Sequence, residues 1–455
     1  MASLAVMLKN LGHQVSGSDG VLYPPMSTYL EKNQIPVFQS YKAENIHQAK
    51  ADLYIIGNVI SRGNLELEEV LRLRLPYTSL PEFLKQNFFQ DRYPIVIAGT
   101  HGKTTTTSLT AHLLHLAGLE PGYYVGGLPG NFSVSAKSGE KGCYFVIEGD
   151  EYDTAFYDKR AKFFHYAPHF FLVNNLEFDH GDIYPDLLAI EKTFQLALRL
   201  IPSNGWLLLN GTSERVRNLK NFAFCPVSTF GFDQDCDAVI GSFTPKKGEF
   251  GYHFTFQWEK KSYTFENQLP GKFNLLNSVA AILIALKVGA KVEQIAKGLD
   301  SFVTTQRRLQ ILTKQKENIV VDDFAHHPTA IQEGVTAIKQ HFPEHRLFLI
   351  YEPRSNTSLR KFHQDVLGKS FQGADEVFLI QTEKLQKIPA QDRLDFQAVL
   401  KEMESLGSKT HNTFSVEEVK EKLLAVFGGK NIFCVMSQGD CGGLPHALAE
   451  HFEKK

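Results

Sequence analysis

A glycine- and threonine-rich stretch near residue 100 has the residue types of a phosphate-binding loop. It reads AGTHGKTTTT (98–107) and follows the apolar run 95–98. Glycines let the backbone approach a phosphate, and the start of the helix expected at 103–117 offers N–H donors. Lys103 would reach the β- and γ-phosphates of a nucleotide, and the hydroxyl of Thr104 or Thr105 would hold Mg²⁺. The alternative is a helix capped by a threonine-rich turn.

This loop is shorter than the general phosphate loop. The spacing G-x-x-x-x-G-K-[ST] would need a glycine five places before Gly102, and position 97 is Ile. The physics of phosphate binding does not need that glycine, because Gly99, Thr100, His101 and Gly102 still form a turn at a helix N-terminus. We therefore expect a nucleotide site outside the general class.

Acidic residues follow two of the predicted buried strands. Glu148 ends the strand expected at 144–148 and opens EGDEYD (148–153), while Asp179 and His180 follow the strand expected at 170–175. Ligands of open α/β sheets bind at the C-terminal ends of strands. A phosphate-bound Mg²⁺ needs only one or two protein ligands, so Glu148 with His180 would form a second metal site facing Lys103. Taken alone, each acidic loop is more often a solvated turn, but two of them on strands expected to neighbour the phosphate loop favour a metal site.

Two asparagines occur three residues apart at a predicted helix start. Asn274 and Asn277 would share one helix face, where an amide can read the edge of adenine. Helix capping explains the same pair equally well.

Two acids and two histidines occur together in DDFAHHPTA (322–330). Neighbouring histidines on extended backbone point in different directions, and no third metal ligand is evident. A contact to a nucleotide ribose, or loop packing, is therefore preferred to zinc. Arg307 and Arg308, just before this stretch, could clamp a phosphate or form an exposed linker pair.

The composition is that of a soluble globular protein. The 455 residues are 43% hydrophobic and 22% charged, with a formal net charge of -2, which gives no electrostatic reason to expect nucleic acid or an anionic membrane as partner. The five cysteines show no C-x-x-C spacing, which favours a reducing compartment. No apolar run is long enough to span a membrane, and residues 1–11 read as an amphipathic helix. We expect a cytoplasmic protein of unknown oligomeric state.

The elements that position these residues alternate between strand and helix. Predicted strands lie at 13–19, 51–58, 95–98, 144–148, 170–175 and 206–210, hairpins near 240–265, a helix at 275–288, and four strand-then-loop units within 318–330, 346–357, 374–381 and 431–440. This pattern predicts an α/β protein of three domains, at residues 1–92, 93–305 and 306–455. The first domain begins with a helix, whereas a dinucleotide-type unit begins with a strand and a glycine-rich turn.

Together the motifs resemble the Mur ligase family, ATP-dependent enzymes that join amino acids or peptides to UDP-N-acetylmuramic acid. The family loop G-T-x-G-K-[ST] fits Gly99 to Thr104, and the likeness extends along the chain. It includes E-x-D-E (148–151), N-x-E-x-D-H (175–180), G-x-x-N-x-x-N (271–277) and D-D-[FY]-x-H-H-P-T (322–329). The resemblance implies a Rossmann-like UDP-sugar domain, a central ATPase domain and a Rossmann-like C-terminal domain. It also implies ATP and Mg²⁺.

The resemblance assigns roles to individual residues. Lys103, Glu148 and His180 would be catalytic, and Thr104 or Thr105, Glu148 and His180 would hold two Mg²⁺ ions. Asn277 would face adenine, Asp323 the ribose and Arg308 the phosphates, with His326 a second candidate beside them. Arg354 is our own candidate for gripping a peptide carboxylate, because it ends a predicted strand and arginine binds carboxylates in a bidentate manner.

Four stretches are closer to one branch of the family. They are YPPMST (23–28), GGLPGNF (126–132), DEYDTAFYDKRAKFFHY (150–166) and EPRSNT (352–357). That branch attaches the tripeptide L-Ala-γ-D-Glu-meso-diaminopimelate to UDP-N-acetylmuramate in peptidoglycan recycling, through an acyl phosphate. The alternatives are a UDP-N-acetylmuramate–L-alanine ligase, a folylpolyglutamate-synthase-like enzyme, or a non-catalytic nucleotide-binding module.

The sequence departs from the family pattern in three places. Gly271-KFN-Asn274 replaces a G-x-H-N motif, and SQGDCGG (437–443) differs from the usual version in the tripeptide branch. The family also opens with a strand and a G-x-x-G-x-x-M turn near the UDP diphosphate, which would lie upstream of Met1. We expect weaker UDP-sugar binding without that turn, which a comparison of KM with an upstream-extended chain would test.

Overall fold

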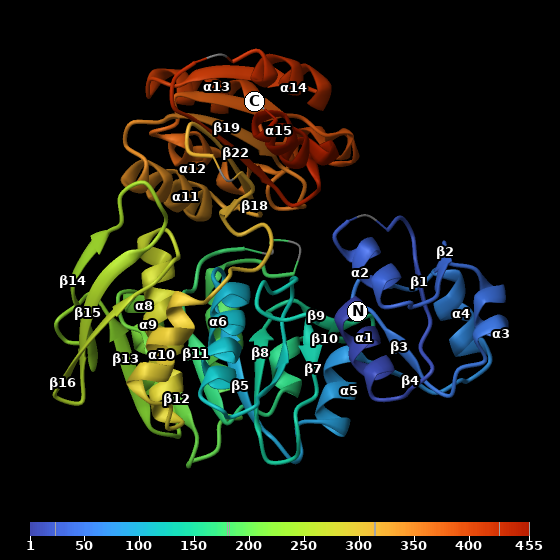
Figure 1. Ribbon diagram of the computed structural model, residues 1–455. Helices are drawn as coiled ribbons and strands as arrows, with labels where there is room; N and C mark the ends of the chain where they lie inside the picture. The colour runs from blue at the N-terminus through green and yellow to red at the C-terminus, as the bar shows by residue number, and fades with distance from the viewer. Residues whose placement is uncertain (23, 180, 182, 314, 427, 455) are drawn as a thin grey trace.

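The computed structural model has three lobes that follow one another along the chain (Figure 1). It describes residues 1–22, 24–179, 181, 183–313, 315–426 and 428–454. The central lobe holds a ten-stranded sheet and the C-terminal lobe a six-stranded sheet. The predicted three-domain α/β class is confirmed, while the exact boundaries at 92/93 and 305/306 stay predictions. Within the described ranges, no helix has the length and apolar character needed to cross a membrane.

The N-terminal lobe contains two separate pairs of parallel strands, β1–β2 and β3–β4. Its elements are α1 (Ala2–Asn10), β1 (Gly17–Asp19), α2 (Met26–Lys32), β2 (Val37–Gln39), α3 (Ala43–Ala49), β3 (Tyr54–Ile56), α4 (Leu65–Arg72), β4 (Tyr77–Ser79) and α5 (Leu80–Asn87). The amphipathic helix expected at 1–11 is confirmed as α1. Its Leu4 and Met7 pack into the same apolar cluster as Phe145 of the central sheet, whereas Val6 packs with Tyr29 of α2. Helix α1 therefore joins the first two lobes.

The central lobe places strand β5 between two parallel neighbours, β11 and β8. Its elements are β5 (Tyr93–Ala98), α6 (Lys103–Leu116), β6 (Gly122–Tyr124), β7 (Ala136–Lys137), β8 (Tyr144–Gly149), β9 (Asp153–Ala155), β10 (Asp158–Ala161), β11 (Phe170–Val173), α7 (Leu187–Leu198), β12 (Trp206–Asn210), α8 (Glu214–Asn218), β13 (Val227–Gly231), β14 (Ala238–Pro245), β15 (Tyr252–Trp258), β16 (Lys261–Glu266), α9 (Lys272–Lys287) and α10 (Val292–Asp300). Ala98 pairs with both Gly149 and Val173, so the three strands end level. The loops after them converge at one edge of the sheet.

Helices α6 and α9 are buried on one face of this sheet because their apolar side chains share a single core. Helix α9 begins at Lys272, three residues before the predicted start. The hairpins expected near 240–265 are confirmed as the antiparallel strands β14, β15 and β16, which extend the sheet. The β14–β15 hairpin also touches the C-terminal lobe. Tyr252 Oη donates to Gln340 Oε1 at 2.9 Å, and Gly248 N donates to His341 O at 3.0 Å.

The C-terminal lobe has the strand order β17-β18-β22-β19-β20-β21. Its elements are β17 (Gln310–Ile311), β18 (Asn318–Asp323), α11 (Pro328–His341), β19 (Arg346–Glu352), α12 (Gln364–Leu367), β20 (Glu376–Ile380), α13 (Phe396–Ser405), β21 (Lys409–Thr413), α14 (Val416–Leu424), β22 (Asn431–Ser437) and α15 (Leu444–Glu453). The four predicted strands correspond to β18, β19, β20 and β22. The edge strands β17 and β21 were not predicted, because β17 is only two residues long and β21 reads KTHNT, without the apolar run that marks a buried strand.

Candidate active site

The glycine loop after β5 packs onto a floor of asparagines. Gly102 has φ +81°, and a Cβ there would lie 2.6 Å from Asn277 Oδ1 and 3.0 Å from Asn174 Nδ2. Gly99 has φ +132°, and a Cβ there would lie 2.9 Å from the backbone nitrogen of Asn175. Both positions therefore combine a conformation that favours glycine with a lack of space for a side chain.

Asn175 holds the middle of the loop through both ends of its amide. Its Oδ1 accepts from His101 N at 2.7 Å and its Nδ2 donates to His101 O at 3.1 Å. Thr100 Oγ1 accepts from Glu177 N at 2.9 Å. Sequence reasoning assigned no role to Asn174 or to Asn175, the first residue of the family motif at 175–180, although a polar pair directly after the buried strand β11 is the same signal that identified Glu148.

Lys103 lies in a ring of oxygen acceptors. Its Nζ donates to Gly99 O at 2.7 Å and to Glu151 Oε2 at 2.8 Å, and Glu151 is only 3% exposed. Burial acts to lower the pKa of Lys103, but attraction to Glu151 and the neighbouring acids outweighs it and raises that pKa. Lys103 is therefore a buried, charged ammonium group paired with Glu151, the last residue of the family motif at 148–151, a role that the sequence analysis did not assign.

Thr104 and Glu148 form a hydroxyl–carboxylate pair behind the loop. Thr104 Oγ1 donates to Glu148 Oε2 at 3.0 Å, and Gly126 N donates to Glu148 Oε1 at 2.5 Å. This contact favours Thr104 over Thr105, which is also buried, as the hydroxyl beside the acid. Burial raises the pKa of Glu148. The other predicted metal ligand, His180, lies outside the described residues.

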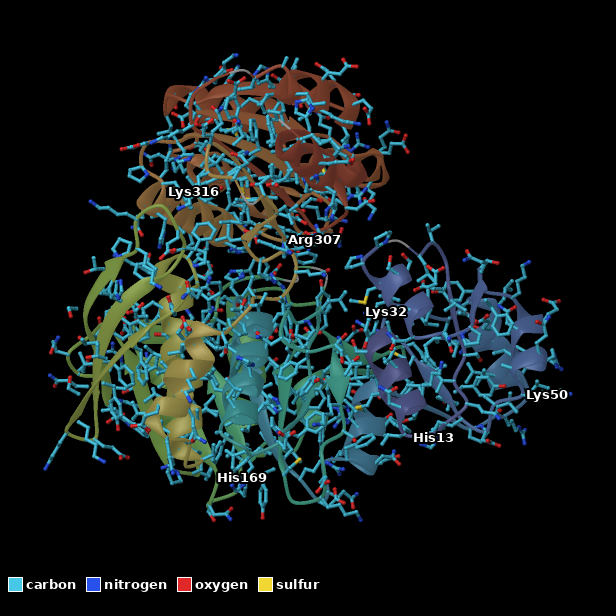
Figure 2. All side chains as sticks on the ribbon, in the orientation of Figure 1. His13, Lys32, Lys50, His169, Arg307 and Lys316 are labelled. Carbon is cyan, nitrogen blue, oxygen red and sulfur yellow. The ribbon has the colours of Figure 1, made fainter. Side chains whose placement is uncertain are left out.

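Arg308, at the start of the C-terminal lobe, reaches the Thr104–Glu148 pair of the central lobe. Arg308 Nη2 donates to Thr104 Oγ1 at 3.3 Å, and its guanidinium lies 5.0 Å from the ring centroid of Phe324. Figure 2 shows the neighbouring Arg307 at the junction of the two lobes. Arg307 Nε lies 3.4 Å from Asp322 Oδ2. Of the two consecutive arginines, Arg307 therefore contacts the C-terminal lobe and Arg308 contacts the central lobe.

Asp323 and His326 are buried beside Arg308. Asp323 Oδ1 accepts from Phe324 N at 2.8 Å and Leu309 N at 3.2 Å, yet burial raises its pKa to about 6. His326 Nδ1 lies 3.1 Å from Phe324 O, and burial lowers its pKa to about 4. The structure thus places both predicted nucleotide residues near Arg308, the arginine that reaches Thr104.

Asn277 is placed beneath the loop rather than beside it. Asn174 Nδ2 donates to its Oδ1, its Nδ2 donates to Asn274 Oδ1 at 2.9 Å, and it is 1% exposed. Its amide therefore supports Gly102 in this structure. The predicted adenine contact stays a prediction.

Arg354 lies apart from the loop, in the C-terminal lobe after β19. Its Nε is 3.2 Å from Glu352 Oε1, and Ser437 Oγ donates to Glu352 Oε2 at 2.5 Å. A Cβ at Gly439 would overlap the Arg354 guanidinium. The two stretches that the sequence connects with peptide specificity, 352–357 and 437–443, therefore meet at one arginine.

These groups fit a nucleoside triphosphate with Mg²⁺. The loop has no room for side chains at Gly99 and Gly102, Lys103 supplies a cation, and Thr104 with Glu148 supplies hard oxygen donors.

Three family models match consecutive parts of the chain. Residues 1–91 match the Mur ligase family catalytic domain, 97–285 the Mur ligase middle domain, and 307–439 the Mur ligase glutamate ligase domain.

The chain belongs to the Mur ligase family. Among Mur ligases, it is 38% identical over 461 residues to UDP-N-acetylmuramate–L-alanyl-γ-D-glutamyl-meso-2,6-diaminoheptandioate ligase of Escherichia coli K12, covering 100% of this chain and 96% of the relative. A solved murein peptide ligase from Psychrobacter arcticus is 31% identical, with a TM-score of 0.75 and coverage of 100% and 97%.

A second type of Mur ligase has the same fold. The solved UDP-N-acetylmuramate–alanine ligase of Thermotoga maritima superposes with a TM-score of 0.82, covering 100% of this chain and 96% of that one, at 20% identity. Fold likeness therefore does not separate the two kinds of ligase. Sequence identity does: it is 38% to the tripeptide ligase of Escherichia coli K12 and 30% to the UDP-N-acetylmuramate–L-alanine ligase of Endomicrobium trichonymphae, with coverage of 93% of this chain and 91% of the relative.

Proposed function

We propose that this Mur ligase uses ATP to join L-Ala-γ-D-Glu-meso-diaminopimelate to UDP-N-acetylmuramate in the recycling of cell-wall peptide. The observation that carries the proposal is the 38% identity, along the whole chain, to an enzyme named for that tripeptide. The five cysteines, all free thiols, support a reducing cytoplasmic location.

The reaction has two balanced steps. A carboxylate oxygen of the muramate attacks the γ-phosphorus of ATP, the bond to the β-phosphate oxygen breaks, and ADP leaves. The tripeptide amine then attacks the carbonyl carbon of the acyl phosphate, loses a proton, and displaces inorganic phosphate to form the amide. Both steps concentrate negative charge on phosphoryl oxygens, so positioned cations do most of the work.

Lys103 and Arg308 supply that charge from two sides. To bind phosphate, Lys103 Nζ must leave Glu151 and pair with phosphoryl oxygens instead. The buried ammonium then still has an anionic partner, so its charge stays compensated. Arg308 comes from the C-terminal lobe, so the phosphate site is complete only when the two lobes are together.

Mg²⁺, when bound, would neutralise the β- and γ-phosphate oxygens. Thr104 and Glu148 are the described residues that would hold it, because their oxygens already lie 3.0 Å apart. His180 remains the proposed ligand of a second ion. Asp323 would accept hydrogen bonds from the ribose, and Arg354 would grip a carboxylate of the peptide.

The test is ADP formation by the full chain with Mg²⁺, ATP and UDP-N-acetylmuramate, with tripeptide, with L-alanine, or with neither. We expect release that requires the UDP sugar and a higher kcat/KM for the tripeptide. Preference for L-alanine would identify a de novo ligase instead. Release of ADP without either acceptor or UDP sugar would indicate an ATPase or nucleotide switch and would overturn the proposal.

A further inference from the structure

Four metal-binding side chains gather where the central and C-terminal lobes meet. His101 comes from the nucleotide loop and Glu177 from the loop after β11, while His327 is the N-cap residue before α11 and His363 ends a short 3₁₀ turn, 361–363. Glu177 Oε2 lies 3.6 Å from both His101 Nε2 and His327 Nδ1. The ring centroids of His101 and His327 are 4.5 Å apart, and those of His327 and His363 are 4.6 Å apart.

Two of the imidazole nitrogens make no hydrogen bond in the part of the chain that the structure describes. His101 Nε2 and His363 Nε2 are both buried there without a hydrogen-bond partner. A buried polar atom without a partner costs free energy, so each needs an explanation. The sequence argued against zinc at the two histidines because it showed no third ligand. The fold supplies that ligand from a different lobe.

The donor set suits a borderline transition metal rather than Mg²⁺. Imidazole nitrogens with one carboxylate are typical Zn²⁺ ligands, whereas Mg²⁺ prefers oxygens alone. Bonds of about 2.0–2.1 Å in a tetrahedron place neighbouring ligand atoms about 3.4 Å apart, close to the 3.6 Å separations here. Burial lowers the pKa of His327 and His363, which favours the neutral imidazole, with one ring nitrogen free to coordinate.

Thr329 positions two of the donors. Its N–H donates to His327 Nδ1 at 3.3 Å, and its hydroxyl donates to Glu177 Oε2 at 2.6 Å. A bound cation would replace the long first contact and leave the second to orient the carboxylate. The hydrogen bonds of Thr329 therefore hold the ligands near one another before a cation binds.

We propose that His101, Glu177 and His327, whose ligand atoms all lie within 4.8 Å of one another, form an interdomain binding site for Zn²⁺ or a similar transition-metal ion, flanked by the ring of His363. The ligands come from two lobes, so the ion binds fully only when the lobes are together. By mass action it stabilises that closed arrangement. The inference stands independently of the proposed substrate.

The test is calorimetric titration of ZnCl₂ into the full-length chain, without nucleotide and with excess Mg²⁺ to occupy sites built of oxygens. CoCl₂ serves as a spectroscopic probe, since its visible absorption reports nitrogen coordination. The variants are Glu177→Gln, which keeps the shape of the side chain, and His327→Asn, which keeps an acceptor at the N-cap of α11. His253→Asn is the control, because His253 is an exposed histidine on β15.

We expect one site whose affinity falls at least about tenfold in both variants and is unchanged in the control. Small-angle scattering should show Zn²⁺-dependent compaction in the parent chain that His327→Asn loses. Equal affinity in all four proteins, or no binding to the parent chain, would overturn the proposal. Thermal unfolding of each variant identifies one that has failed to fold, and ADP formation is measured separately, so neither proposal depends on the other.

Discussion

At the scale of single residues, the Arg354 guanidinium packs directly against the backbone of Gly439. Gly439 has no left-handed φ, so an alanine there acts only through overlap with the guanidinium. We expect Arg354→Ala and Gly439→Ala both to raise the KM for the tripeptide, by about tenfold for a lost charge-assisted contact. The KM for UDP-N-acetylmuramate should not change. Steady-state kinetics measures both, and an unchanged tripeptide KM would remove Arg354 from the peptide site.

The raised pKa of Asp323 predicts that nucleotide binding depends on pH. Burial raises its pKa to about 6, so the carboxylate that would bind ribose becomes a neutral acid as pH falls through about 6. ADP affinity should therefore fall by up to about tenfold per pH unit below that point. Asp323→Asn should bind ADP more weakly at neutral pH and lose this part of the dependence. Parallel pH profiles that keep a constant ratio between the two proteins would contradict the assignment.

At the scale of elements, the loop before α6 is held by sterics as well as by conformation. Gly102 and Gly118, one at each end of α6, have similar φ values of +81° and +76°, but only Gly102 lacks space for a Cβ. Alanine at Gly118 should cost about 1 kcal/mol of stability and leave ADP binding unchanged. Alanine at Gly102 should also weaken ADP binding at least about tenfold, about 1.4 kcal/mol. Equal ADP affinities would show that the asparagine floor does not shape the loop.

The sequence predicted the strands whose C-terminal ends carry the site residues, because buried parallel strands are apolar runs that stop at polar residues. It did not predict that Glu151 pairs with Lys103 or that Asn175 clamps His101, because these contacts depend on the register that ends β5, β8 and β11 level. It also could not place His101 against His327. That contact joins two lobes and depends on how they dock, which no local pattern records.

At the scale of the whole molecule, Thr329 contributes a hydrogen bond that joins the central and C-terminal lobes. Its hydroxyl donates to Glu177 of the central lobe, whereas that of Thr336, on the same helix, donates to Gln332 O within α11. Thr329→Val should shift the balance toward separated lobes by about fivefold, the value of a hydrogen bond worth about 1 kcal/mol. Small-angle scattering should report a larger radius of gyration. Thr336→Val should not change it, and a matching increase there would indicate a general loss of helix stability.

Helix α11 touches the central lobe at both ends, near the nucleotide loop through Thr329 and near the β14–β15 hairpin through Gln340 and His341. With the hairpin end as pivot, the 14 residues form a lever about 20 Å long. A turn of about 10° would move its loop end by about 3.5 Å, more than the length of a hydrogen bond, while the pivot end barely shifts. Small rotations of the C-terminal lobe are thus amplified where the chemistry occurs.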